Sequence, residues 1–271
     1  MKCRITNALL LSFLAAMFAP AAGLAQALAL APAQVVETFT PGVPFEIELS
    51  ALNRGGMPVE MSAEITDLWY NEKNEKVFPA PGTSPRSAAN WIQFVPEHFA
   101  VPANGSQKMK AIVTPPAEVE GGYYAVLFVT SKPQLAPNTP ANSGKAIYTN
   151  MRIGCLVLLG VKNTERYKIE LSDIKLIPPA ANQPLEMSFT FDNQGNIHVF
   201  PVARLAVLDA DRKLVAKAEG EARRFLPGQK DSMKVNWTGT LPAGDYTALL
   251  TVTYGEDRIQ TEQVPFKVTG D

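Results

Sequence analysis

Hydrophobic and polar residues alternate in short runs along the chain from Leu28 onward. The segments Phe45–Leu49 and Ile169–Leu171 alternate strictly. A period of two is typical of β-strands that bury one face. Clusters of Pro, Gly and Asn, such as Asn104-Gly105, separate the runs at intervals of about 8 to 12 residues, which is the spacing of β-sandwiches. The pattern therefore predicts an all-β chain without a long helix.

An internal repeat divides the expected strands into two sets. An apolar strand, an Asn-x-Gly turn and an apolar return strand occur twice, 140 residues apart. The matching positions are Phe45, Asn53, Gly55 and Val59 in the first copy and Leu185, Asn193, Gly195 and Val199 in the second. Repetition of one strand pattern predicts two similar domains. We place them at residues 28–163 and 164–271, each an immunoglobulin-like β-sandwich, with the boundary near 162–166.

A second match between the copies begins with a Gly-x-Tyr sequence. Gly122–Phe128 corresponds to Gly244–Leu250 at an offset of 122. This arrangement resembles the tyrosine corner of immunoglobulin-like sandwiches, in which the Tyr hydroxyl binds the backbone upstream. The smaller offset means that the first copy contains about 18 extra residues. We assign them to Tyr70–Asn90, as an elaborated loop or an edge hairpin.

The first 27 residues have the pattern of a secretory signal peptide. Lys2 and Arg4 precede the apolar stretch Leu9–Phe18, and Ala25-Gln26-Ala27 fits the cleavage pattern. A transmembrane anchor fits less well, because the apolar stretch is short for a span of about 20 residues. We expect a mature chain that starts at Leu28, is periplasmic or otherwise exported, and does not insert into a membrane after cleavage.

Composition and charge exclude several classes of function. Lysine and arginine total 25 against 26 acidic residues, and no basic run occurs, which argues against nucleic acid as a partner. The chain has two histidines, His98 and His198, for which we expect strand-surface or capping roles. Cys155 is the single cysteine after the leader, and we expect it to be buried. Local catalytic and nucleotide-binding motifs are missing, so we predict no enzyme, no cofactor and no metal.

The segment Ser131–Gly160 is the best candidate for a functional surface. A loop at 132–144 is too long for a tight hairpin. Beyond it, Ile147, Thr149, Met151 and Ile153 share one strand face, while Arg152 lies on the other. From Ile153 to Leu159 the residues are continuously apolar, as in a strand buried on both faces, here by the second domain. Alternatively, this is an ordinary last strand whose alternating side faces its own core.

The chain resembles the periplasmic pilus assembly chaperones, and it is also similar to the WxL-interacting surface proteins. The motifs that carry the resemblance are Trp91-Ile92-x-Phe94-x-Pro96-x-x-Phe99-x-Val101-Pro102 and Gly121-Gly122-Tyr123-Tyr124-Ala125. The chaperone resemblance implies that the last strand of the first domain lends apolar side chains to an incomplete subunit. It also implies that a basic pair in the interdomain cleft holds the subunit's terminal carboxylate. The implied residues are Ile147, Met151 and Ile153 for the lent side chains and Arg152 for one basic anchor. The expected strand of the second anchor, 28–39, contains no Lys or Arg.

Two functions remain open from the sequence. The first is an exported chaperone that binds secreted or surface subunits of the fimbrial type by β-strand addition. Its partner-binding residues are Ile147, Thr149, Met151, Arg152 and Ile153. The alternative is a non-catalytic periplasmic or surface adhesion module. It would bind a glycan or a partner protein through loop aromatics such as Trp69 and Tyr70.

Overall fold

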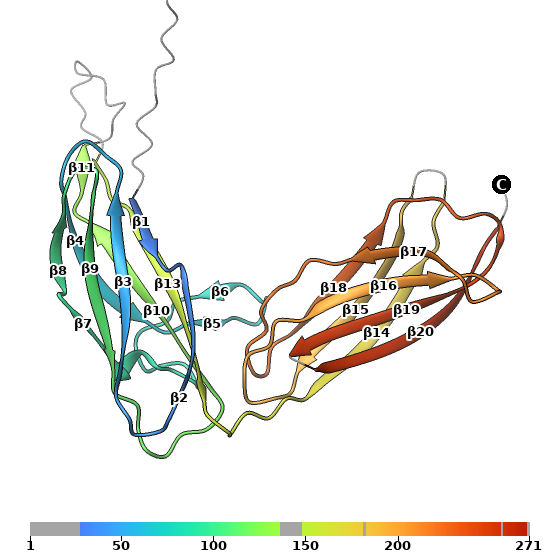
Figure 1. The fold of residues 1–271 in the computed structure, drawn as a ribbon, viewed down its shortest axis with the longest axis horizontal. Coiled ribbons are helices and arrows are strands. Elements are labelled where there is room, and N and C mark those ends of the chain that lie inside the picture. The colour runs from blue at the N-terminus through green and yellow to red at the C-terminus, as the bar shows by residue number, and fades with distance from the viewer. Residues whose placement is uncertain (1–27, 136–147, 181–182, 256, 270–271) are drawn as a thin grey trace, which may run out of the picture.

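A computed structural model describes residues 28–135, 148–180, 183–255 and 257–269. Strands dominate these residues, with one 3₁₀ turn at Ala89–Trp91 and no α-helix, so the predicted all-β class is confirmed. The strands form two sandwiches that meet at an angle (Figure 1). In the described part of the chain, no helix is long and apolar enough to cross a membrane. The predicted signal peptide at residues 1–27 and Ile147 lie outside the described residues.

The first sandwich packs two antiparallel-rich sheets around one apolar core. Its first sheet has the order β1 (Leu28–Ala31), β3 (Phe45–Asn53), β9 (Gly105–Val113) and β7 (Ile92–Val95). Its second sheet has the order β2 (Gln34–Phe39), β13 (Arg152–Val161), β10 (Gly122–Ser131), β4 (Val59–Thr66) and β8 (His98–Val101). Inward residues of both sheets, such as Leu49, Met109 and Leu127, are fully buried, because alternate residues of a strand point to opposite faces.

The second sandwich repeats this plan with its own core. One sheet has the order β14 (Ile169–Ile177), β15 (Leu185–Asn193) and β18 (Lys230–Trp237). The other has the order β17 (Leu214–Glu219), β16 (Val202–Leu208), β19 (Gly244–Gly255) and β20 (Arg258–Val268). Phe189, Phe191 and Phe225 are the largest fully buried side chains of this second core. The two separate cores make each sandwich a unit of packing.

The repeated Asn-x-Gly turn is built in the same way in both sandwiches, which confirms the repeat. Asn53 Nδ2 donates to Met57 O at 2.7 Å, and Asn193 Nδ2 donates to Ile197 O at 2.9 Å, four residues on in each case. In each turn the Asn Oδ1 accepts the N–H of the glycine two residues later. A buried Asn therefore closes the turn after β3 and after β15, because its amide satisfies backbone groups that water cannot reach.

The match of Gly122–Phe128 with Gly244–Leu250 is wrong by one residue. Tyr246 points into the second core and its hydroxyl donates to Pro242 O at 2.9 Å, as in a tyrosine corner. Tyr124 points away from the first core, and its hydroxyl has no hydrogen-bond partner among the described residues. Tyr123 is the residue that packs against the first core, so it is the structural counterpart of Tyr246. A slip of one position exchanges the two faces of a strand.

The extra segment of the first copy contains a hairpin, as predicted. Strands β5 (Trp69–Tyr70) and β6 (Lys76–Val77) pair in antiparallel fashion, and the hairpin reaches toward the second sandwich (Figure 1). Asp67, at its base, is fully buried and accepts hydrogen bonds from Gly82 N at 3.0 Å and Ser84 N at 2.6 Å. These bonds hold the loop that follows the hairpin.

Candidate functional site

Strand β13 is buried on both faces over its second half. This confirms the expectation that the continuously apolar run ending at Leu159 is a strand covered on both sides. Cys155, Val157 and Leu159 belong to the first core. Leu156 and Leu158 point the other way, into a smaller apolar cluster that we call the junction cluster. Its members are Leu68, Trp69, Tyr70, Tyr124, Val126, Phe128, Leu156 and Leu158 of the first sandwich and Leu226 of the second. The second sandwich therefore contributes to the cover of β13.

The burial of Cys155 gives a first prediction. The thiol lies in the first core, and burial raises its pKa from the usual 9.0 to about 11. Because the thiolate is the reactive form, Cys155 should react with a disulfide reagent at pH 8 many times more slowly in the folded protein than in urea. Thiol titration with and without urea measures this. Equal rates would show that β13 is not packed as described.

The predicted partner-binding residues lie along the start of β13 and the short strand before it. Thr149 is exposed on β12 (Tyr148–Thr149), which pairs with β11 (Gln134–Leu135). Met151 and Ile153 are partly buried at the rim of the first core. Arg152 is exposed on the opposite face. The described members of the set thus share one short stretch of backbone, with the apolar side chains turned toward the first sandwich.

The guanidinium of Arg152 already has partners within the first sandwich. Arg152 Nε donates to Glu64 Oε1 on β4 at 2.6 Å. Its guanidinium carbon also lies 3.7 Å from the centre of the Phe128 ring. The cation–π contact and the ion pair hold this side chain flat against the sheet.

One edge of β13 is open over its first half. Strand β2 runs parallel to β13, but the pairing begins only at Leu156 and Gln34. Leu156 N donates to Ala33 O at 3.1 Å, and the chain before Ala33 crosses to the opposite sheet as β1. Alternate residues direct their backbone groups to the same side, so Arg152 and Gly154 face this edge as Leu156 does. Among the described residues, no strand pairs with Arg152–Cys155 on the β2 side. We call this segment the open edge.

The two sandwiches approach closely at the turn after β15. Gly122 N donates to Asn196 O at 2.7 Å, and Asn196 Nδ2 donates to Thr164 O at 2.9 Å. Gly121 has a φ of +74, in the left-handed region, and a Cβ at that position would overlap the Asn196 carbonyl oxygen. The Gly121-Gly122 pair is therefore explained by close approach of the backbone.

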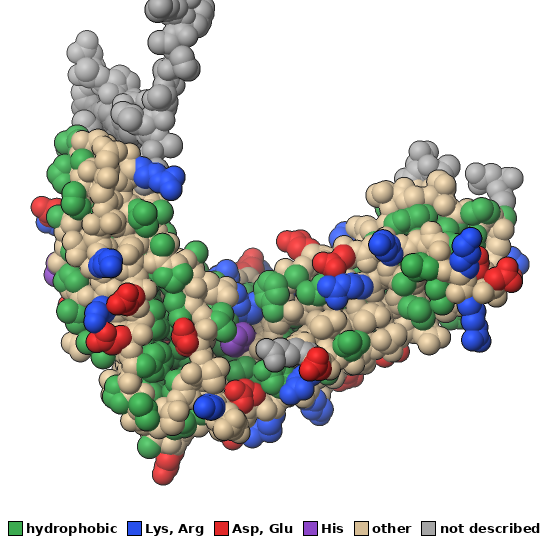
Figure 2. Space-filling model, viewed as in Figure 1, with side chains coloured by type: hydrophobic (Ala, Val, Ile, Leu, Met, Phe, Trp, Pro, Cys, Tyr) green, Lys and Arg blue, Asp and Glu red, His purple; other side chains and the backbone are tan. Residues whose placement is uncertain are grey.

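Polar side chains without full partners gather at the same junction. His198 contacts Tyr124 edge to face, with ring centres 5.7 Å apart, and the His198 Nδ1 is buried without a partner among the described residues. Burial, with a smaller contribution from the Arg224 cation, lowers the pKa of His198 from 6.5 to about 4. The expectation of a surface or capping role for His198 is wrong, because the turn after β15 packs against the first sandwich. Figure 2 shows basic and apolar side chains together at the inner corner of the molecule.

Arg224 is a cation at this junction that the sequence did not single out. It is half-buried, and its Nη2 donates to Gln34 Oε1 at the start of β2. Burial lowers the pKa of the Arg224 guanidinium below its usual value. Arg224 is not among the ion pairs that the described residues form. The junction therefore contains a positive charge held by a neutral amide.

The hairpin β5–β6 also contacts the second sandwich at the junction. Asn74 Nδ2 donates to Lys230 O of the second sandwich at 2.8 Å. A cavity of about 280 Å³ lies between the hairpin and the turn at Leu226–Lys230. Trp69 and Tyr70 are packed against the junction cluster. These aromatics thus contribute to the contact between the sandwiches, which leaves them less suited to a sugar platform.

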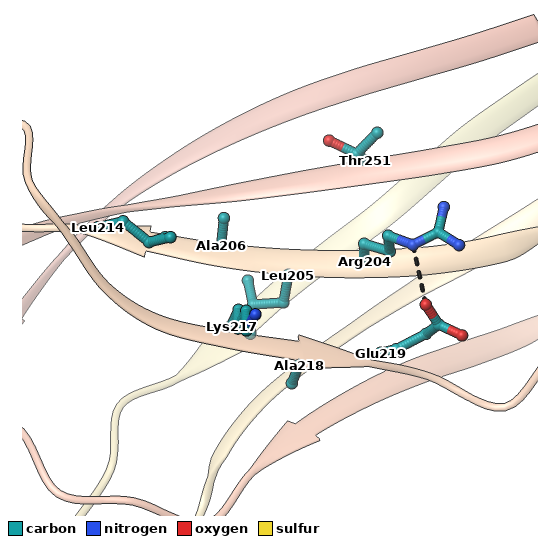
Figure 3. Close-up of a pocket in the computed structure, with 8 residues that line it drawn as sticks. All are labelled: Arg204, Leu205, Ala206, Leu214, Lys217, Ala218, Glu219 and Thr251. Carbon is teal, nitrogen blue, oxygen red and sulfur yellow. Dashed lines mark hydrogen bonds and ion pairs between the residues drawn. The ribbon is translucent and has the colours of Figure 1, made fainter.

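A larger groove of about 570 Å³ lies on the second sandwich, over β16, β17 and β19 (Figure 3). Three charged side chains line it, Arg204, Lys217 and Glu219, and Arg204 and Glu219 form an ion pair at 2.8 Å. No histidine or cysteine lines the groove. Within the described ranges, no group of three or more His, Cys, Asp or Glu residues is placed to hold a metal.

Comparison with known proteins identifies the fold. No protein-family model matches the chain, and no curated protein matches it. The crystal structure of the class 5 fimbriae chaperone CfaA aligns with 9% identity and a TM-score of 0.51, covering 89% of this chain and 100% of that chain. A chaperone–tip adhesin complex of CFA/I fimbriae aligns with 11% identity and a TM-score of 0.49, covering 89% and 98%. The E. coli chaperone DraB aligns with 15% identity and a TM-score of 0.42, covering 90% and 98%. The chain thus has the two-domain immunoglobulin-like fold of the periplasmic fimbrial chaperones, as predicted.

Proposed function

We propose that this protein is an exported chaperone that binds fimbrial-type subunits by β-strand addition at the open edge. The observation that carries the proposal is the unpaired side of Arg152–Cys155, next to a stretch where the same strand is fully paired. Unpaired N–H and C=O groups at a sheet edge are a template for another strand. The fold shared with the CfaA chaperone supports the same function.

The bound strand would take up the position that β2 leaves vacant. The backbone groups of Arg152 and Gly154 would supply the hydrogen bonds, and bonds of this kind give affinity without requiring one client sequence. Thr149, Met151 and Ile153, together with Ile147, would contact the alternate side chains of the client strand. Met151 and Ile153 stand at the rim of the first core, so a client side chain placed beside them would extend that core.

Arg224 is our proposed anchor for a client carboxylate. It stands at the end of the open edge where β2 begins, and its charge has no carboxylate partner among the described ion pairs. The resemblance implies a basic residue in the strand 28–39, where this chain has Gln34. The guanidinium of Arg224, which Gln34 holds, supplies positive charge at that place. A carboxylate can bind such a guanidinium through two parallel hydrogen bonds.

Two variants of Arg152 distinguish the role of its backbone amide in binding from the role of its side chain. Both variants remove the ion pair with Glu64. Arg152→Pro also removes the amide N–H that faces the open edge, whereas Arg152→Ala keeps this N–H. We expect Arg152→Pro to bind a synthetic peptide of alternating apolar residues about tenfold more weakly than Arg152→Ala does. Calorimetric titration measures both. Equal binding by the two variants would exclude strand addition at this edge.

The proposed role of Arg224 is tested with two forms of the synthetic peptide, one with a free C-terminal carboxylate and one with a C-terminal amide. The wild-type protein should prefer the free C-terminal carboxylate over the C-terminal amide by about tenfold or more, because a charged hydrogen bond is stronger than a neutral one. Arg224→Gln should remove this preference. Arg204→Gln, which removes a paired arginine on the second sandwich, should retain it. A preference that persists in Arg224→Gln would assign the carboxylate to another residue.

A further inference from the structure

His198 occupies an unusual position between the two sandwiches. Its imidazole lies against the Tyr124 ring of β10, and its Nδ1 has no partner among the described residues. The charged groups that act on the pair are Arg86, of the segment after β6, and Arg224, of the loop between β17 and β18. Tyr70 of β5 lies beside Arg224 and Arg223, and Arg223 is paired with Asp231. Both charges that act on the pair are positive, so a proton on His198 would add a like charge to a buried contact.

We propose that the junction is an acid-sensitive contact, in which protonation of His198 releases the second sandwich from the first. The imidazole is packed as a neutral group against an aromatic edge, close to the Arg224 guanidinium. An imidazolium there would be both desolvated and repelled. Residues 162–168 would still connect the sandwiches covalently. This inference does not depend on the proposed binding of subunits.

The direction of the pH effect follows from the pKa of His198 in the closed and open states of the junction. The pKa of His198 is lowered to about 4 in the closed state, against an ordinary value of 6.5 when the junction is open. The closed state is therefore fully favoured above pH 6.5 and is weakened as the pH falls toward 4. For these two pKa values, the ratio of open to closed molecules at pH 5 is about 30-fold higher than at neutral pH.

Hydrogen exchange at a single amide can measure this ratio. The Gly122 N–H donates to Asn196 O across the junction, so its protection reports the closed state. The Gly220 N–H donates to Ala203 O at 2.9 Å inside the second sandwich and serves as the internal reference. Exchange should be followed by NMR on the full chain at pH 7.5 and pH 5, with correction for intrinsic exchange rates.

We expect the protection of Gly122 to fall about 30-fold between the two pH values, while that of Gly220 is unchanged. His198→Phe and His198→Gln, which cannot be protonated, should abolish the fall. His98→Gln, which replaces the exposed histidine, should retain it. Equal pH responses in wild type and both His198 variants would overturn the proposal, and so would a wild-type protection factor that does not change with pH.

Discussion

Asn193→Ala is expected to lower the free energy of unfolding of the second sandwich by about 3 kcal/mol. The side chain is fully buried, and its Nδ2 donates to Ile197 O at 2.9 Å and to Phe225 O at 3.2 Å. Its Oδ1 accepts from Gly195 N at 3.1 Å. Alanine leaves Ile197 O and Gly195 N without partners, where an unsatisfied group is costly, whereas Phe225 O keeps its bond from Val199 N. Urea denaturation followed by circular dichroism measures the loss.

Two further alanine variants control this result. Asn53→Ala removes the equivalent side chain of the first sandwich and should destabilise that sandwich to a similar extent. Asn236→Ala removes an exposed side chain on β18 and should change the free energy of unfolding by less than about 0.5 kcal/mol. A loss of less than about 1 kcal/mol for Asn193→Ala would mean that the turn does not depend on this side chain.

The repeated turn explains why the fold could be predicted from the sequence. Alternation of apolar residues in segments such as Phe45–Asn53 depends only on which strand face is buried. The Asn-x-Gly turns can also be recognised locally, because Asn53 and Asn193 bond to residues two and four positions away in addition to their bonds to distant residues. Such features are encoded within about ten residues, so the sequence displays them directly.

The error at Tyr124 shows where a local pattern becomes insufficient. Both strands have the sequence Gly-x-Tyr, but β10 is covered on both faces while β19 faces its own core only with alternate residues. A strand buried on both faces has no alternation to set its register. The side on which each Tyr lies is then decided by the second sandwich, which is distant in sequence. The presence of a Tyr in the sequence therefore could not show which face of the strand it occupies.

The junction was not predictable for the same reason. Arg224 meets Gln34 across 190 positions of sequence, and Asn74 meets Lys230 across 156. One sequence signal was present: an Arg pair directly before the apolar turn Phe225–Gly228 places charge beside burial. The open edge is also a long-range property, because it depends on the residue at which β2 begins to pair with β13.

Leu226→Asp is expected to separate the two sandwiches without unfolding either of them. Leu226 is buried in the junction cluster, and it is the one member that the second sandwich contributes among the described residues. A carboxylate at this position cannot remain in the apolar contact, so the closed junction should lose at least about 3 kcal/mol. Small-angle X-ray scattering should show a larger radius of gyration, and urea should still unfold both sandwiches cooperatively.

The neighbouring residue provides the matched control. Phe225 is fully buried but points into the second core, where it packs against Phe191 with ring centres 4.6 Å apart. Phe225→Asp should therefore abolish the unfolding transition of the second sandwich, since loss of a core Phe alone costs about 3 to 5 kcal/mol. Leu214→Asp, at an exposed position of β17, should change neither property. If Leu226→Asp unfolds the second sandwich as Phe225→Asp does, Leu226 stabilises that sandwich directly. If its radius of gyration equals that of the wild type, the junction is held by the hydrogen bonds of Asn196 and Asn74 without the apolar contact.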